Sequence, residues 1–134
     1  MRWPLRPWLT VVGGIYWLAM FIATHIPKVP QELVMPGGDK GMHFTAYAVL
    51  ALILTTRQFW GAHWKWRTAA QIIVVVAVYG IVDELTQIPV GRHADVWDWL
   101  ADVSGALFGL ATAAGLRLLG PGRLQKNPGP TVPR

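Results

Sequence analysis

The sequence predicts an all-α integral membrane protein with four transmembrane helices, and three observations support this fold class. Of the 134 residues, 53% are hydrophobic and only 14% are charged, whereas a soluble domain carries about a quarter charged residues. The hydrophobic residues lie in four long runs, separated by short segments rich in proline, glycine or charge. A bilayer requires roughly 20 apolar residues per helix, so four spans would take up about 80 residues. Little then remains for an extramembrane domain.

The first predicted helix extends from Trp8 to Ile26 and contains no Lys, Arg, Asp or Glu. The preceding Arg2 and Arg6 would also fit a secretory signal. However, the apolar stretch is longer than the roughly 7–15 residues of a signal core, and no small-residue cleavage site follows before Pro27. We therefore expect an uncleaved transmembrane helix.

Two further apolar runs predict the second and third helices. The second extends from His43 to about Trp60, and the third from Thr68 to Ile88. Residues 27–42 contain three prolines and three glycines, which predicts a loop before the second helix. The third run is unusual because two acidic residues, Asp83 and Glu84, interrupt it near its end.

The fourth helix is predicted from about Asp95 to Leu119, after a turn at Pro89-Val90-Gly91. Asp95 is suited to cap this helix, and Asp98 places a favourable negative charge in its first turn. Residues 120–134 are rich in proline and glycine and are expected to form a flexible tail. The predicted transmembrane domain is therefore 1–119.

The distribution of basic residues predicts that both termini are cytoplasmic. In that orientation nine Lys and Arg residues lie on the cytoplasmic side, against three on the other side (Lys28, Lys40 and Arg92). The lipid bilayer is the expected partner. Nucleic-acid binding is not expected, although the net charge is +5, because the basic residues are scattered around hydrophobic runs.

The acidic residues gather in the outer half of this topology. All seven fall there: Glu32, Asp39, Asp83, Glu84, Asp95, Asp98 and Asp102. Since acidic residues contribute little to topology, membrane insertion does not explain this distribution. A concentration of carboxylates over the helix ends is typical of a site.

Helical spacing groups the candidate site residues on shared faces. His43 and Tyr47 are four residues apart, as are Asp83 and Gln87. Asp98 and Asp102 are also four apart, and their face continues through two glycines. Glu84 is adjacent to Asp83, and Asp39 and Lys40 immediately precede the His43 run.

Several of these residues have an alternative structural interpretation. Lys40 and Arg92 are long enough to reach the membrane surface from a helix end. Asp39 is also suited to capping, and Tyr47 to an aromatic belt. His25 and His93 are interpreted as incidental, and Gly105-x-x-x-Gly109 as a helix-packing motif.

Asp83, Glu84 and Asp102 are the hardest to interpret as structural residues. An ionised carboxylate inside a membrane helix costs several kcal/mol unless it is paired or hydrated. One interpretation is a buried ion-pair network in which Arg92 or Lys40 joins the helices. The other is a polar site that solvent can reach.

The sequence lacks the standard catalytic signatures. It contains no cysteine, and its one serine, Ser104, is not in a G-x-S-x-G motif. No H-E-x-x-H or other local metal motif is present. A site assembled across helices could still bind a hard cation or perform acid–base chemistry. The catalytic candidates are His43, Glu84, Asp98 and Asp102, and the spacing identifies no particular cofactor or metal.

Two segments of the chain resemble the VanZ-like membrane proteins. The first is Asp39-Lys40-x-x-His43-Phe44-x-x-Tyr47. The second is Asp83-Glu84-x-x-Gln87-x-x-x-x-Arg92, followed by Asp98-x-x-x-Asp102-x-x-Gly105-Ala106-x-x-Gly109. Asp102 stands where the family usually has asparagine. The resemblance covers roughly residues 20–115 and implies a bacterial four-helix membrane protein. The family's namesake lowers susceptibility to the glycopeptide antibiotic teicoplanin, which does not by itself assign resistance to this chain.

Three functions remain open at this level, in order of preference. The first is a membrane-embedded protein that binds a cationic or lipid-linked component of the cell envelope. The second is an enzyme acting on a lipid-linked headgroup, with Glu84 or Asp98 as general base, His43 as acid or ligand, and Lys40 and Arg92 holding a phosphate. The third is a purely structural subunit of unknown oligomeric state. The binding candidates are Asp39, Lys40, Tyr47, Asp83, Gln87 and Arg92.

Overall fold

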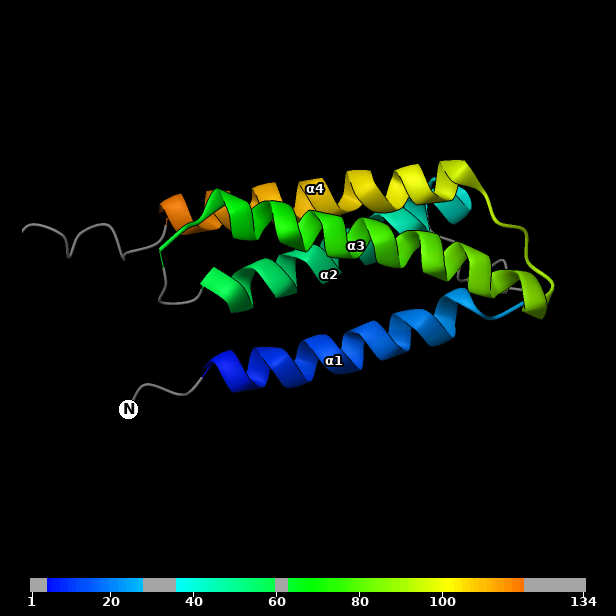
Figure 1. Ribbon diagram of the computed structural model, residues 1–134, viewed down its shortest axis with the longest axis horizontal. Coiled ribbons are helices and arrows are strands. Elements are labelled where there is room, and N and C mark those ends of the chain that lie inside the picture. The colour runs from blue at the N-terminus through cyan, green and yellow to red at the C-terminus, as the bar shows by residue number, and fades with distance from the viewer. Residues whose placement is uncertain (1–4, 28–35, 60–62, 120–134) are drawn as a thin grey trace, which may run out of the picture.

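The computed structural model describes residues 5–27, 36–59 and 63–119. These residues form an all-α structure with four α-helices and one short 3-10 helix, shown in Figure 1. The elements are α1 (Leu5–Thr24), α2 (Gly38–Phe59), α3 (Trp66–Gln87), η2 (Ile88–Val90) and α4 (Val96–Leu119).

The four α-helices lie side by side and alternate in direction along the chain (Figure 1). The C-terminal ends of α1 and α3 therefore meet the N-terminal ends of α2 and α4 at one end of the molecule, at the right in Figure 1. We call this the site end. Helix α2 contacts all three other helices, and its largest interface is with α4.

Small residues on α4 allow it to approach α2 closely. Gly105 and Gly109 are buried, and a Cβ atom at either position would collide with the α2 backbone at Phe44 or Ala48. Close backbone approach through small residues is a common way for membrane helices to associate. The packing function predicted for Gly105-x-x-x-Gly109 is therefore confirmed.

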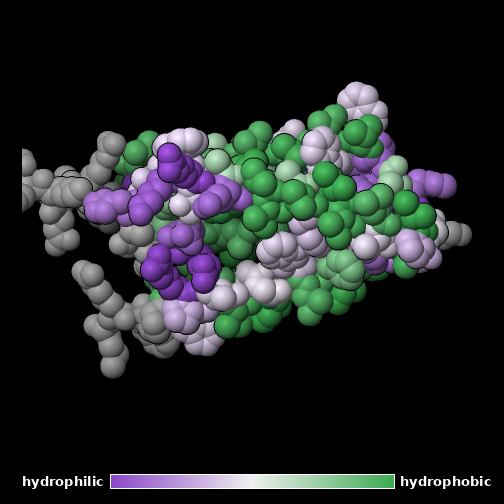
Figure 2. Space-filling view, viewed as in Figure 1, coloured by the Kyte–Doolittle hydropathy of each residue, from purple (hydrophilic) through white to green (hydrophobic). Residues whose placement is uncertain are grey.

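The exterior of the structure is largely apolar. Large hydrophobic side chains are exposed along α1, α3 and α4, for example Ile15 at 65%, Val74 at 60% and Phe108 at 59%. Figure 2 shows an apolar middle, with hydrophilic residues gathered toward the two ends. Three helical segments are long and apolar enough to cross a membrane: Leu5–Thr24, Trp66–Val90 and Val96–Leu119. Helix α2 is not among them.

The predicted helices are recovered with boundaries that differ by up to five residues, and the largest difference is at the start of α2. Helix α2 begins at Gly38 rather than His43, so Asp39 and Lys40 belong to its first turn rather than to the loop. Their polarity resembles that of a loop, yet a first turn accepts an acidic residue because its N–H groups are unpaired. The prediction that Asp95 caps α4 is confirmed, since its side chain accepts a hydrogen bond from the Trp97 N–H at 2.9 Å. The predicted tail, 120–134, lies outside the described residues.

Candidate functional site

The site end contains a group of buried polar side chains contributed by α2, α3 and α4. His43 is 3% exposed, Glu84 and Asp98 are 5% exposed, and Asp102 is fully buried. The four catalytic candidates are therefore all buried. Asp83, Tyr47 and Gln87 are also buried, whereas Asp39 and Lys40 are exposed and Arg92 is half-buried.

His43, Glu84 and Asp102 form the group that we call the inner cluster, with one residue from each of α2, α3 and α4. The Nδ1 atom of His43 lies 2.9 Å from Asp102 Oδ1 and 3.9 Å from Glu84 Oε1. The other oxygen of Glu84 accepts a hydrogen bond from the Asp95 backbone N–H at 2.7 Å. The inner cluster thus connects three helices through one imidazole ring.

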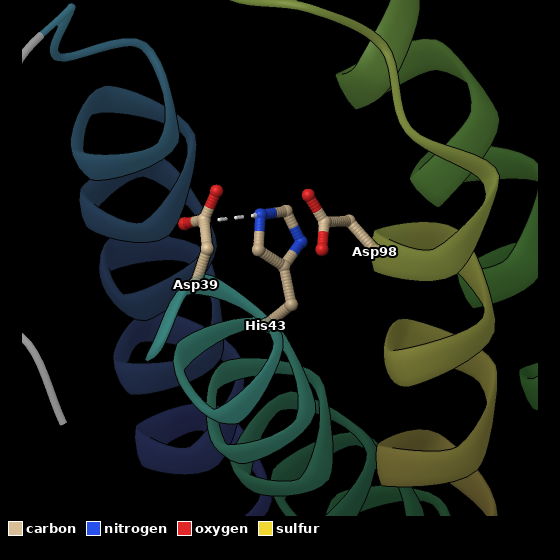
Figure 3. A group of neighbouring side chains, drawn as sticks. All are labelled: Asp39, His43 and Asp98. Carbon is tan, nitrogen blue, oxygen red and sulfur yellow. Dashed lines mark ion pairs between the residues drawn. The ribbon is translucent and has the colours of Figure 1, made fainter. Parts of the chain in front are cut away.

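Asp39, His43 and Asp98 form an outer cluster, nearer to the surface. Figure 3 shows the His43 ring between the Asp39 and Asp98 carboxylates, with Asp39 Oδ1 at 4.0 Å from His43 Nε2. Both carboxylates have a cationic partner. Arg92 binds Asp39 at 2.6 Å, and Lys40 binds Asp98 at 3.0 Å.

Lys40 also binds Asp95, and this interaction changes the acidity of an exposed group. The Asp95 carboxylate accepts hydrogen bonds from the Trp97 N–H and from the Lys40 ammonium group. Both favour the ionised form, and the pKa of Asp95 lies below its ordinary value. Asp95 therefore stays negative and holds Lys40 close to the outer cluster.

Asp83 belongs to a separate network that attaches α1 to α3. Its carboxylate accepts hydrogen bonds from Thr24 at 3.0 Å and from Gln87 at 3.2 Å. His25 lies 3.9 Å from Asp83 and contacts the Thr86 hydroxyl at 3.1 Å, so it is not incidental as the sequence suggested. These contacts satisfy Asp83 and explain its burial structurally.

The structure does not support the buried ion-pair network between the basic residues and the deep carboxylates. Arg92 binds Asp39 and the Thr24 carbonyl. Within the described ranges 5–27, 36–59 and 63–119, neither Arg92 nor Lys40 lies within 4.0 Å of Asp83, Glu84 or Asp102. Within the described part of the chain, His43 is therefore the one basic side chain within 4.0 Å of the inner-cluster carboxylates.

Two carboxylate oxygens of the inner cluster lack a hydrogen-bond partner among the described residues. They are Glu84 Oε1 and Asp102 Oδ2, and the buried Tyr47 hydroxyl is in the same situation. Tyr47 is fully buried, so it does not belong to an aromatic belt. Buried polar atoms are normally hydrogen-bonded, and an exception calls for an explanation such as a bound water, a bound ion or a catalytic function.

Two cavities flank the inner cluster. The first, of about 280 Å³, lies between α1 and α2; its walls include Ala19, Met20 and Ala23, and its polar end is formed by Asp39, His43 and Arg92. The second, of about 330 Å³, lies between α3 and α4 and is lined in part by Glu84 and Trp99. His43 therefore borders one cavity and Glu84 the other.

Sequence reasoning missed two contributors to this region. Thr24 binds Asp83 from α1, and Gly80 lies beside Asp102, where a Cβ atom would come within 3.0 Å of Asp102 Oδ2. The available sequence signals were a threonine hydroxyl near the end of an apolar helix and a glycine within a helix rich in valine. Neither signal identifies its partner.

The fold and the site together define a multi-pass membrane protein with a buried acidic site at one end of its helices. Three helices are apolar enough to cross a membrane, and the carboxylates that interrupt their apolar character converge at the site end. The chain belongs to the VanZ/LLP1 family, whose family model matches residues 7–118. The resemblance seen in the sequence is thereby confirmed. No match was found among curated proteins or solved structures.

Proposed function

We propose that this chain binds a lipid-linked or cationic component of the bacterial cell envelope at the site end. The observation that carries the proposal is the cavity between α1 and α2. Its walls are mostly apolar, and its end carries Asp39, His43 and Arg92. Ligand sites typically combine an apolar lining with a few convergent polar groups. This combination suits a molecule with a hydrocarbon chain and a polar headgroup.

The proposal includes four membrane spans, both termini in the cytoplasm, and a site end that faces outward from the cytoplasmic membrane. Helix α2 has 22 residues, or about 33 Å at 1.5 Å per residue, and a bilayer core is about 30 Å thick. Since α2 contacts the other three helices, it does not need a fully apolar surface. The nine-to-three distribution of basic residues supports the orientation.

The candidate residues divide into three groups in this proposal. Asp39, Arg92 and Lys40 contact the headgroup. Asp39 and Arg92 line the polar end of the cavity, Lys40 is exposed, and together they carry both signs of charge. His43, Glu84, Asp98 and Asp102 form the floor beneath it, together with Tyr47. Asp83 and Gln87 support the floor by holding α1 and α3 together.

Filling the cavity should abolish binding of a lipid. Ala23 lines the cavity, so Ala23→Trp would place an indole where the hydrocarbon chain lies. We expect affinity for phosphatidylethanolamine, measured by native mass spectrometry of the purified protein, to fall by at least about tenfold, or 1.4 kcal/mol. The neighbouring Ile22 is 57% exposed and is absent from the lining, so Ile22→Trp is the matched control. Equal binding by both variants would refute the proposed cavity.

The second candidate function, an enzyme acting on a lipid-linked headgroup, is favoured by the inner cluster. The His43–Asp102 contact of 2.9 Å orients an imidazole beside the unpaired Glu84 oxygen, which is an arrangement suited to acid–base catalysis. Under this hypothesis Glu84→Gln lowers turnover of a lipid-linked substrate by about 10²–10⁴-fold while lipid binding is retained. Turnover that survives this substitution would eliminate Glu84 as the general base. A wild-type protein that binds the lipid-linked substrate but does not turn it over favours the first function.

A further inference from the structure

Among the described residues, the inner cluster contains two carboxylates and no Lys or Arg partner. Asp39 and Asp98 in the outer cluster are paired with Arg92 and Lys40. Among the residues that the structure describes, Glu84 and Asp102 have no Lys or Arg within 4.0 Å. With both carboxylates ionised and His43 neutral, the inner cluster would have a charge of about −2, which is costly in a membrane interior unless protons or a cation compensate it.

The unpartnered oxygens show that both carboxylates have unused capacity to bind a cation. Glu84 is 5% exposed and Asp102 is fully buried, yet Glu84 Oε1 and Asp102 Oδ2 accept no hydrogen bond within the described part of the chain. Glu84 Oε1 faces His43 Nδ1 at 3.9 Å. Beside Asp102 Oδ2 the chain has Gly80, where a Cβ atom would fill the space.

The spacing of the three side chains suits one metal ion. One ligand atom from each of His43, Glu84 and Asp102 lies within 4.8 Å of the others. His43 Nδ1 lies 2.9 Å from Asp102 Oδ1 and 3.9 Å from Glu84 Oε1. Ligands around a small divalent ion with bonds of about 2.1 Å are about 3.0–3.4 Å apart, which lies between these two distances.

We propose that His43, Glu84 and Asp102 bind a divalent transition-metal ion, Zn²⁺ or Mn²⁺. One imidazole nitrogen and two carboxylates favour these ions over Ca²⁺ and Mg²⁺, which prefer oxygen ligands alone. A charge of +2 would neutralise the two carboxylates. Asp39 Oδ1 lies 4.0 Å from His43 Nε2, on the side of the ring from which a carboxylate orients a metal-binding histidine once it comes within hydrogen-bond distance. The metal site does not depend on lipid binding.

The inner cluster is preferred over the outer cluster as the metal site because of charge balance. Asp39, His43 and Asp98 are also close enough to surround an ion. Their carboxylates already bind Arg92 and Lys40, so an ion there would have to displace two salt bridges. Among the described residues, an ion in the inner cluster would replace the proton between His43 Nδ1 and Asp102 Oδ1 and would displace no Lys or Arg.

Metal content of the purified full-length protein tests this site directly. After incubation with Zn²⁺ or Mn²⁺ and dialysis, we expect about one equivalent per chain by inductively coupled plasma mass spectrometry, as for a single-ion site. Glu84→Gln and Asp102→Asn should each weaken metal affinity by at least about 10- to 100-fold. The matched control is Asp83→Asn, which removes a buried carboxylate from the same turn of α3, and it should retain the metal. Asp95→Asn removes a nearby carboxylate while keeping a residue suited to capping α4, and it should also retain the metal.

Wild-type measurements keep the test decisive if a variant does not fold. Zn²⁺ should raise the Tm of the wild-type protein, and EDTA should reverse the increase. Co²⁺ as a replacement ion should give visible d–d absorption typical of a site with nitrogen and oxygen ligands. A wild-type protein that retains no metal and shows neither signal would overturn the proposal. Metal retention that persists in Glu84→Gln and Asp102→Asn would also overturn it.

Discussion

Gly105→Ala and Gly109→Ala should each destabilise the protein by about 1–3 kcal/mol, although each adds only one methyl group. At both positions the new Cβ atom would collide with backbone atoms of α2, at Phe44 and Ala48 respectively. A backbone cannot rotate away as a flexible side chain can, so α2 and α4 would have to separate. This interface is the largest between any two helices, and its loss would affect the whole fold.

A third glycine on the same helix provides the control. A Cβ atom at Gly115 would have no neighbour within 4 Å among the described residues. Gly115→Ala should therefore be neutral, or stabilising by up to about 1 kcal/mol, because alanine favours a helix more than glycine does. The measurement is unfolding in detergent followed by circular dichroism. Equal effects at Gly109 and Gly115 would contradict the close α2–α4 packing.

His43→Leu should destabilise the protein by roughly 1–3 kcal/mol, the usual cost of leaving a buried hydrogen-bonding group without its partner. The substitution removes the only described side chain that binds the buried Asp102 Oδ1, and it also removes the imidazole beside Glu84. The unfolding experiment should contain EDTA, so that bound metal does not contribute to the difference.

A double-mutant cycle separates this interaction from lost packing. Asp102→Leu alone should also be destabilising, because it leaves the buried His43 ring without its 2.9 Å partner. The double variant, His43→Leu with Asp102→Leu, should cost less than the sum of the two single changes by about 0.5–3 kcal/mol. Strictly additive effects would mean that the two side chains do not interact.

The sequence was sufficient for the helices because apolar runs determine where a chain can be helical in a membrane. The start of α2 was misplaced because hydropathy does not distinguish a polar first turn from a polar loop. Asp39 and Lys40 look the same in either setting, and only the backbone hydrogen bonds differ. Hydropathy also gives no measure of how deeply a helix is surrounded, so the central position of α2 could not be predicted.

The faces of the site were predictable, but the contacts across them were not. Spacing of four residues placed His43 with Tyr47, and Asp98 with Asp102, on shared faces. The pairing of His43 with Asp102 depends on the relative height and rotation of α2 and α4, which no local pattern encodes. The same applies to the hydrogen bond between Thr24 and Asp83, which are 59 residues apart in the chain.

Helix α1 has few buried residues, and this affects how a molecule could enter the cavity between α1 and α2. Only Gly13 and Met20 of this helix are buried. Its polar contacts include Arg6 with the Gln58 carbonyl near one end, Tyr16 with the Ala46 carbonyl, and Thr24 with Asp83 at the other end. A helix with so little buried surface separates from its neighbours at a lower free energy than global unfolding requires. If a lipid occupies the cavity as proposed, we expect it to enter laterally from the bilayer, between α1 and α2, when α1 separates locally from its neighbours.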